Sequence, residues 1–219
     1  MSPDDQPPPP AALPPPASDV AFTAAVKAAQ ERLGSRAAMA RSAVSRPWKT
    51  TVTDDLRDFL GMIDTAFLAT ASADGRPYVQ HRGGPAGFIK VLDERTLAFA
   101  DFGGNRQYIT VGNLSENDRA LIFVLHFASR QRVKLWGRAR VVEDDPALLQ
   151  RLAEPGYKAR VERAIVFSLD AWDSNCQSHI TERYSEAEIA PAVDKLTARI
   201  RELEGENAAL RAAMREPAP

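Results

Sequence analysis

Short runs of apolar residues, separated by turn-forming residues, fill the middle of the chain. Residues 66–70 and 78–82 flank Ala73-Asp74-Gly75, a sequence typical of a β-hairpin turn. Further strands are predicted at 88–92, 97–101, 120–127, 132–142 and 164–169. Short strands linked mostly by hairpins predict a small antiparallel barrel, within a mainly β fold with flanking helices (α+β).

Apolar residues at helical spacing predict helices around these strands. Residues 22–33 are expected to form one helix, with Ser18 and Asp19 as its caps and Gly34 at its end. Thr53 is expected to cap a second helix. Two more are predicted, at 106–114 and, opened by a proline in the first turn, at 146–152.

The clearest periodic pattern is a C-terminal heptad repeat, which we predict to begin at Pro191 because proline breaks a longer helix. The core positions are Val193, Ile200, Asn207 and Met214 at a, and Leu196, Leu203 and Leu210 at d. β-Branched a with Leu d favours two parallel helices, and a single Asn at a fixes their register. The charges at positions g and e also favour a parallel homodimer, because Arg199 would face Glu204 of the partner helix and Glu206 would face Arg211. We predict a parallel homodimeric coiled coil; the alternative is packing on its own domain.

Composition narrows the class of protein. The 219 residues carry a net charge of −1, which gives no general attraction to nucleic acid or acidic membranes. Cys176 is the single cysteine, so no internal disulfide can form and a reducing, cytoplasmic location is predicted. No apolar run approaches the ~20 residues of a membrane span, and the N-terminus lacks a signal-peptide pattern. The acidic stretch before the heptads excludes a basic-region DNA-binding helix.

Changes in pattern divide the chain into four predicted parts. A proline-rich tail at 1–17 is predicted to be disordered, because it lacks the apolar mass for a core. An N-terminal helix and connecting arm occupy 18–52, the barrel 53–185 and the coiled-coil helix 186–219.

A Gly-rich turn at Gly103-Gly104 precedes three polar residues, Asn105, Arg106 and Gln107, at the predicted start of a helix. Such a turn exposes backbone N–H groups at the positive end of the helix dipole. Arginine adds a planar fork of donors that suits a phosphate. We interpret this stretch as the phosphate end of a site for flavin mononucleotide (FMN).

Residues 67–142 resemble the pyridoxamine 5′-phosphate oxidase-like, FMN-binding split-barrel family. The matching features are a strand pair ending in Arg82, a strand ending at Ala100-Asp101, the triplet 105–107, a helix to Asn117 and a strand with Val133-Lys134-Leu135-Trp136-Gly137. Residues 19–39 and the tail Trp172-Asp173-Ser174-Asn175-Cys176 look like one bacterial branch of that family. The resemblance covers roughly residues 19–185.

The resemblance implies a split barrel that dimerises with two FMN molecules at the subunit interface. Arg82 would lie along the phosphate or ribityl chain, and Arg106 would grip the phosphate, while Lys134 would approach from within the interface. Gln107 stands where many relatives have Lys. Trp172 is either a core aromatic or a flavin contact. The candidate cofactor-binding residues are Arg82, Asn105, Arg106, Gln107, Lys134, Trp136, Trp172 and Asn175.

We predict an FMN-dependent oxidoreductase that acts on a small organic substrate, with NAD(P)H as the candidate electron donor. No catalytic side chain is assigned, because the flavin ring does the chemistry while the protein binds and orients it. No metal is expected, since His81, His126 and His179 lack ligand spacing. The alternatives are a non-catalytic split-barrel module that holds flavin, haem or a deazaflavin, and a pure interaction protein. With haem, His81 or His179 would be the axial ligand.

Overall fold

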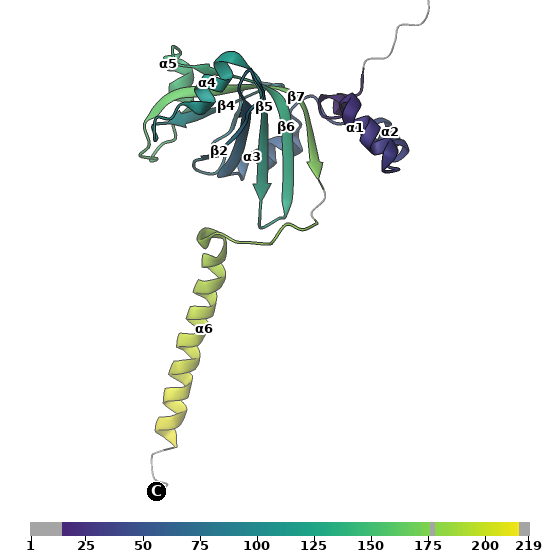
Figure 1. Ribbon diagram of the computed structural model, residues 1–219. Helices are drawn as coiled ribbons and strands as arrows, with labels where there is room; N and C mark the ends of the chain where they lie inside the picture. The colour runs from purple at the N-terminus through teal and green to yellow at the C-terminus, as the bar shows by residue number, and fades with distance from the viewer. Residues whose placement is uncertain (1–14, 176–177, 215–219) are drawn as a thin grey trace, which may run out of the picture. The chain divides into compact units, whose positions relative to one another are not determined.

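Seven antiparallel strands form one curled sheet in the order β2-β1-β5-β6-β7-β4-β3 (Figure 1). This computed structural model describes residues 15–175 and 178–214, except for the side chain of Asn175. Within these residues the sheet does not close, because β2 and β3 lie at its two edges. The expected mainly β, split-barrel fold is therefore confirmed. The strands are β1 (Thr65–Ala71), β2 (Pro77–Gly83), β3 (Lys90–Val91), β4 (Thr96–Phe102), β5 (Arg119–His126), β6 (Gln131–Val142) and β7 (Val161–Asn175).

Alternation of side chains gives the sheet an apolar inner face and a mixed outer face. On β1, Ala66 and Leu68 are buried, while Phe67 between them lies on the outer face near Phe123 of β5. Burial of the inner side chains supplies the main stabilisation of the barrel. The interior is lined by Leu68, Leu97, Phe99, Ile122, Leu135, Ile165, Phe167 and Leu169.

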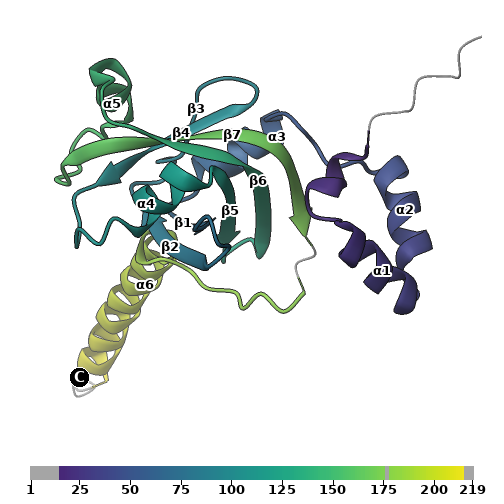
Figure 2. The ribbon, with the colours of Figure 1, turned by 45° about the horizontal axis from the view of Figure 1, so that its top comes forward.

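Helices cover this sheet from two sides. The apolar side of α3, including Leu56 and Phe59, joins the barrel interior. Leu152 of α5 packs with Ala98 and Val166 in a second core on the opposite side of β4 and β7. The helices α1 and α2 pair with each other beside the barrel (Figure 2). The bounds are α1 (Ala24–Arg32), α2 (Arg36–Ser45), α3 (Asp54–Gly61), α4 (Ile109–Glu116) and α5 (Pro146–Leu152), preceded by the 3-10 helix η1 (Ala17–Val20).

The predicted start of α4 was wrong. The helix begins at Ile109 and not at Arg106. Arg106 and Tyr108 have left-handed backbone conformations, with φ of 60° and 54°. A right-handed helix cannot include such residues, so the triplet 105–107 lies in the loop before the helix.

The N-terminal arm is more helical than predicted. Thr23 caps α1 by accepting a hydrogen bond from the Val26 N–H, whereas Ser18 and Asp19, the predicted caps, lie in η1. The helix α2 was not predicted. Its sequence is rich in alanine, which favours a helix without producing a strong apolar periodicity.

Two strands differ in length from the prediction. The strand expected at 88–92 is only Lys90–Val91, because Phe88 closes a tight turn with Pro85 and Ile89 is buried in the core. The strand expected at 164–169 extends over 161–175, long enough to pair with both β4 and β6.

The described residues fall into two compact units. The first holds the sheet and α1–α5, and the second holds residues 127–130 and the segment after 177. The second contains α6 (Glu186–Ala213), which begins five residues before Pro191 because Ser185 and Glu188 form a capping box. None of the described helices is long and apolar enough to cross a membrane. The boundaries predicted at 18, 53 and 186 stay predictions, and most of the proline-rich tail lies outside the described residues.

Gly137 lies where β6 passes close to β7, at a register shift after Trp136. A Cβ there would lie 2.1 Å from the Ser168 carbonyl oxygen and 2.8 Å from Cζ of Phe167. We expect Gly137→Ala to lower the free energy of unfolding by about 3 kcal/mol, because the strands would have to separate. Denaturant unfolding followed by tryptophan fluorescence measures this, since Trp48, Trp136 and Trp172 all lie in the first unit.

The matched control is Gly112→Ala on the exposed side of α4, where an added Cβ meets open space. A glycine-to-alanine change inside a helix should raise stability by up to about 1 kcal/mol. Similar effects of the two substitutions would contradict the close-approach argument.

Candidate functional site

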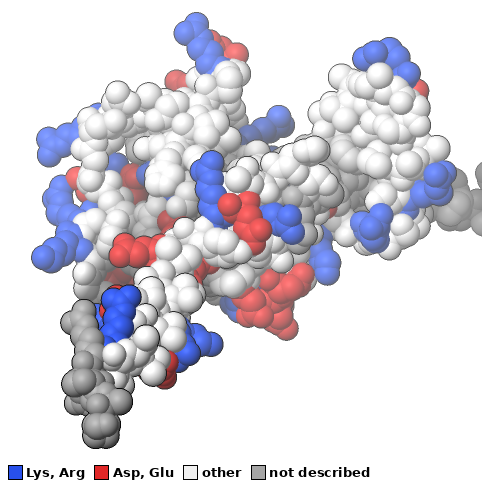
Figure 3. Space-filling view, turned by 90° about the horizontal axis from the view of Figure 1, so that it is seen from below, with Lys and Arg blue, Asp and Glu red and all other residues white. Residues whose placement is uncertain are grey.

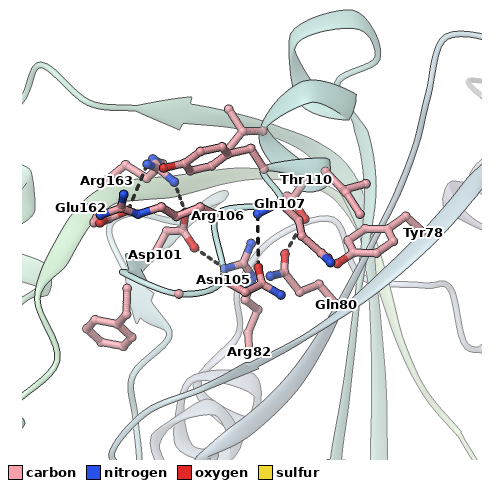
Figure 4. A pocket seen from close by; sticks show the side chains of 15 residues that line it. Tyr78, Gln80, Arg82, Asp101, Asn105, Arg106, Gln107, Thr110, Glu162 and Arg163 are labelled. Atoms are coloured by element: carbon pink, nitrogen blue, oxygen red, sulfur yellow. Dashed lines mark hydrogen bonds and ion pairs between the residues drawn. The ribbon is translucent and has the colours of Figure 1, made fainter.

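Three charged side chains meet on the inner face of the barrel, at the gap in the sheet. Asp101 of β4 follows the buried Leu97 and Phe99 in alternation, and Arg163 of β7 faces it in the ladder. Arg82 of β2 reaches the same carboxylate from a strand that is no neighbour of β4 in the sheet. The Arg163 Nη1 lies 3.0 Å from Asp101 Oδ2, and Arg82 Nη1 contacts Oδ1 (Figure 4). The ion cluster therefore bridges the split in the barrel.

The two arginines are not equally neutralised. Arg163 also bonds Glu143 at 3.1 Å and Glu162 at 3.2 Å. Burial alone would lower the pKa of Arg163, but its hydrogen bond to Asp101 and that carboxylate's charge raise it. Arg82 forms an ion pair with Asp101, and its buried Nε has no hydrogen-bond partner among the described residues. Arg82 is therefore the arginine of this cluster that still has a hydrogen-bond donor free to bind a ligand.

A strained loop, residues 103–108, closes the other side of this cluster. Arg106 and Tyr108 hold left-handed conformations, which are uncommon for bulky residues and typical of functional loops. The Asn105 Oδ1 accepts a hydrogen bond from the Gln107 N–H at 3.3 Å. The guanidinium of Arg163 lies 5.1 Å from the centre of the Tyr108 ring, which fastens the loop to β7.

Two side-chain hydrogen bonds fix α4 against the sheet. Thr110 donates to the Gln80 side-chain oxygen at 2.6 Å, and Asn113 donates to Thr70 at 3.0 Å. Thr110 and Asn113 are both buried. These contacts hold the start of α4, and the loop before it, next to Arg82.

The loop and the ion cluster enclose a cavity of about 50 Å³. Its polar lining includes Gln80, Arg82, Asn105, Arg106 and Gln107 (Figure 4). This volume suits a phosphate-sized group and not a whole flavin, since sites for drug-sized ligands measure about 300–1,000 Å³. Acidic and basic side chains are interspersed over the face seen in Figure 3.

A second and larger cavity, of about 760 Å³, lies between the N-terminal arm and β6–β7. Its aromatic wall is a stack of Trp48 on Trp136, with ring centres 4.6 Å apart and planes at 19°. Lys134 lies 5.2 Å from the centre of the Trp136 ring. Burial lowers the pKa of Lys134 and raises that of Asp173, which faces it on β7; each charge partly opposes the effect of burial on the other.

The structure separates the predicted cofactor residues into two groups. Arg82, Asn105, Arg106 and Gln107 line the small cavity. Lys134, Trp136 and Trp172 line the large one. The cross-strand row that contains Arg82 also contains Ala66 and Val124, which are buried on the inner face. The row that contains Lys134 lies on the outer face, with Phe123, Phe67 and His81. Arg82 therefore lies on the inner face of the sheet, and Lys134 and Trp136 lie on its outer face. Trp172 pairs with Leu135 in the ladder and packs in the inner core.

Trp172 is buried, and its indole N–H donates to the Thr51 carbonyl at 2.8 Å. The side chain of Asn175 lies outside the described residues. His81 lies on the outer face, opposite to Arg82, and its ring meets the edge of Phe67. Among residues 15–175 and 178–214, no three His, Cys, Asp or Glu side chains are grouped as metal ligands.

Sequence reasoning missed Asp101 and Arg163 as members of the site. The predicted strand began at residue 164, so Arg163 was left in a loop. Had the strand been extended by one residue, alternation with Ile165 and Phe167 would have placed Arg163 on the inner face. Asp101 carried its own signal, because a carboxylate that continues the inward alternation of Leu97 and Phe99 requires a buried cationic partner.

An open seven-stranded antiparallel sheet curled around one apolar core belongs to the class of split β-barrels. The family model for pyridoxamine 5′-phosphate oxidase matches residues 52–202. This chain belongs to that family. A search of curated proteins finds no match.

Solved structures with similar folds come from several bacteria. HupZ of Group A Streptococcus is 15% identical, with 60% of this chain and 99% of that one covered and a TM-score of 0.47. An FMN-binding protein of Syntrophomonas wolfei is 14% identical (68% and 97% covered, TM-score 0.42). The FAD binding protein of Mycobacterium smegmatis is 17% identical (58% and 97%, TM-score 0.40). Likenesses of this size identify neither a ligand nor an activity for the present chain.

Removing the charge of Asp101 tests whether the ion cluster holds the gap together. We expect Asp101→Asn to lower the free energy of unfolding by about 3 kcal/mol, since two buried arginines lose their shared counter-charge. Added inorganic phosphate should recover part of the loss, because an anion can replace the carboxylate between the guanidinium groups. Thermal unfolding with and without phosphate measures both effects.

The control is Asp118→Asn, which breaks an exposed pair with Arg138 at 2.8 Å and should change stability little. If the two variants lost equally little stability, the cluster would not be what joins β2 to β4.

Proposed function

We propose that this protein binds FMN and uses it for redox chemistry on a small organic substrate. The observation that carries the proposal is the cavity beside Arg82 and Arg106, which has the size of a phosphate and contains a buried, unused donor on Arg82. A dianionic phosphate matches this surplus of cationic donors. Asn105 and the backbone of the strained loop would hold the remaining oxygens.

The ring of the flavin requires a second surface, because the phosphate cavity is far smaller than the cofactor. Lys134 and Trp136 offer an aromatic wall and a cation, but they lie on the opposite face of the same sheet. We infer that a second copy of the chain supplies this surface, so that one FMN contacts both subunits of a homodimer. Family membership supports this arrangement.

The outer face of the sheet supports dimerisation independently. Val79 on β2 is 59% exposed, and Phe67, Leu121 and Phe123 on neighbouring strands are only partly buried. A contiguous exposed apolar face of this kind is typical of an interaction surface. A matching face on a second copy would remove it from water.

When bound, FMN supplies two-electron transfer; the side chains around it bind, orient and tune it. Arg82 and Arg106 would anchor the phosphate. A cation such as Lys134 near the ring would favour the more negatively charged, reduced form of the flavin. NAD(P)H is the proposed electron donor.

Charge reversal at the loop arginine tests the phosphate site. We expect Arg106→Glu to weaken FMN binding at least about tenfold, equivalent to about 1.4 kcal/mol, while riboflavin binding changes little because riboflavin lacks the phosphate. Quenching of flavin fluorescence during titration measures both affinities. The control is Arg76→Glu in the exposed β1–β2 turn, where the arginine pairs with Asp74.

Three outcomes would contradict the assignment. They are the absence of FMN binding by the wild-type chain, equal affinity for FMN and riboflavin, and parallel losses for the two flavins in Arg106→Glu. A haem absorption band in the freshly purified protein would favour the alternative of a non-flavin module.

Replacing the cation near the proposed ring surface tests the second half of the site. Lys134→Met keeps the aliphatic stem over Trp136 but removes the charge. We expect the midpoint potential of bound FMN to become more negative, by about 30 mV for each 1.4 kcal/mol of lost stabilisation of the reduced form. Lys49→Met is the control, because this exposed lysine lines the same cavity. Equal potentials in Lys134→Met and the wild type would remove Lys134 from this role.

A further inference from the structure

The helix α6 presents an apolar stripe with nothing packed on it within its own compact unit. Its seam residues are between 43% and 87% exposed: Ile189, Val193, Leu196, Ile200, Leu203, Leu210 and Met214. Leaving this many large apolar side chains in water is costly for a helix of 28 residues. A partner surface is therefore required to explain the stripe.

The observed start of α6 lengthens the heptad pattern beyond the sequence prediction. With Val193 at a, Ile189 falls at d, and Glu186–Ala213 spans four heptads. Pro191 falls at f, the position farthest from a partner helix. Its missing N–H therefore lies on the solvent side and leaves the seam continuous.

We propose that the occupant of this stripe is α6 of a second copy of the chain, parallel and in register. Charge complementarity selects a second copy: Arg199 at g meets Glu204 at e, and Glu206 at g meets Arg211 at e. Within one chain, Arg199 bonds Glu202, a residue at position c, at 2.6 Å.

The single asparagine in the seam selects the parallel orientation. In a parallel pair Asn207 meets its own copy, and the two amides hydrogen-bond with each other. In an antiparallel pair every a residue meets a d residue, and the d positions are Ile189, Leu196, Leu203 and Leu210. Asn207 would then be buried against an aliphatic side chain with its amide unsatisfied.

Cysteine cross-linking of the full-length chain tests this arrangement. On a Cys176→Ser background, Leu196→Cys and Leu210→Cys are made at d, and Ala198→Cys and Ala212→Cys at f. Packed helices place facing Cα atoms about 5 Å apart and the outer ones about 14 Å apart. Only the first separation suits a disulfide, so under mild oxidation we expect both d variants to dimerise at least about tenfold faster than the f variants.

Each other outcome overturns the proposal. No cross-link at d rejects the pairing, and equal rates at d and f would show proximity without a helical seam. A mixture of Val193→Cys and Leu210→Cys chains that yields only the mixed dimer would show the antiparallel orientation. Adding Asn207→Leu should allow that mixed product to form, because the buried amide that opposes it is gone.

The outcome is independent of the flavin proposal. FMN binding is titrated on the same Cys176→Ser chain, and it reports on Arg82 and Arg106 whether or not α6 pairs. A negative cross-linking result therefore does not affect the FMN titration, and a negative titration does not affect the cross-linking result.

Discussion

The ion cluster of Arg82, Asp101 and Arg163 is the constraint on which the rest of the barrel depends. Strands β2 and β4 are not neighbours in the sheet, so no ladder of backbone hydrogen bonds can join them. A buried carboxylate between two arginines joins them instead. Because buried charges are costly unless fully compensated, this junction has a narrow range of allowed geometries.

The same junction explains why a strained loop persists beside it. Left-handed residues cost on the order of 1–3 kcal/mol each unless the surroundings over-determine them. Arg163 contacts both Asp101 and the Tyr108 ring, so the side chain that completes the ion cluster also holds the loop. Thr110 and Gln80 fix the first turn of α4 from the opposite side. The cavity is thus shaped by contacts already present before any anion arrives.

Much of the fold could be predicted from the sequence because it depends on local signals. Alternation placed β1, β2, β4, β5 and β6 nearly at their observed limits. The prediction failed where contacts between distant residues determine the backbone conformation. The left-handed Tyr108, which precedes α4, is held by Arg163. Because Arg163 lies more than fifty residues away in the chain, no local pattern could show that α4 starts at Ile109. The alanine-rich α2 failed for the opposite reason, since propensity without periodicity gives a weak signal.

The candidate site was predictable only in part, for a related reason. Residues near in sequence, such as Asn105, Arg106 and Gln107, line one cavity together with Arg82, as their grouping in the prediction requires. Lys134 and Trp136 were grouped with them by resemblance alone, and the ladder register places them across the sheet. Under the FMN assignment proposed above, a second copy of the chain would be needed to bring both groups to one flavin.

Two different surfaces could bring two copies of the chain together, and they differ in the kind of area that they would bury. The outer face of the barrel would bury a broad apolar area, whereas α6 would bury a narrow seam whose register is set by Asn207. A paired α6 would turn the meeting of two barrels into an intramolecular step, with an effective concentration in the millimolar range for a short linker. The barrel face then needs little intrinsic affinity of its own. The face around Val79 could then bring the barrels of the proposed dimer together without being a strong interface by itself.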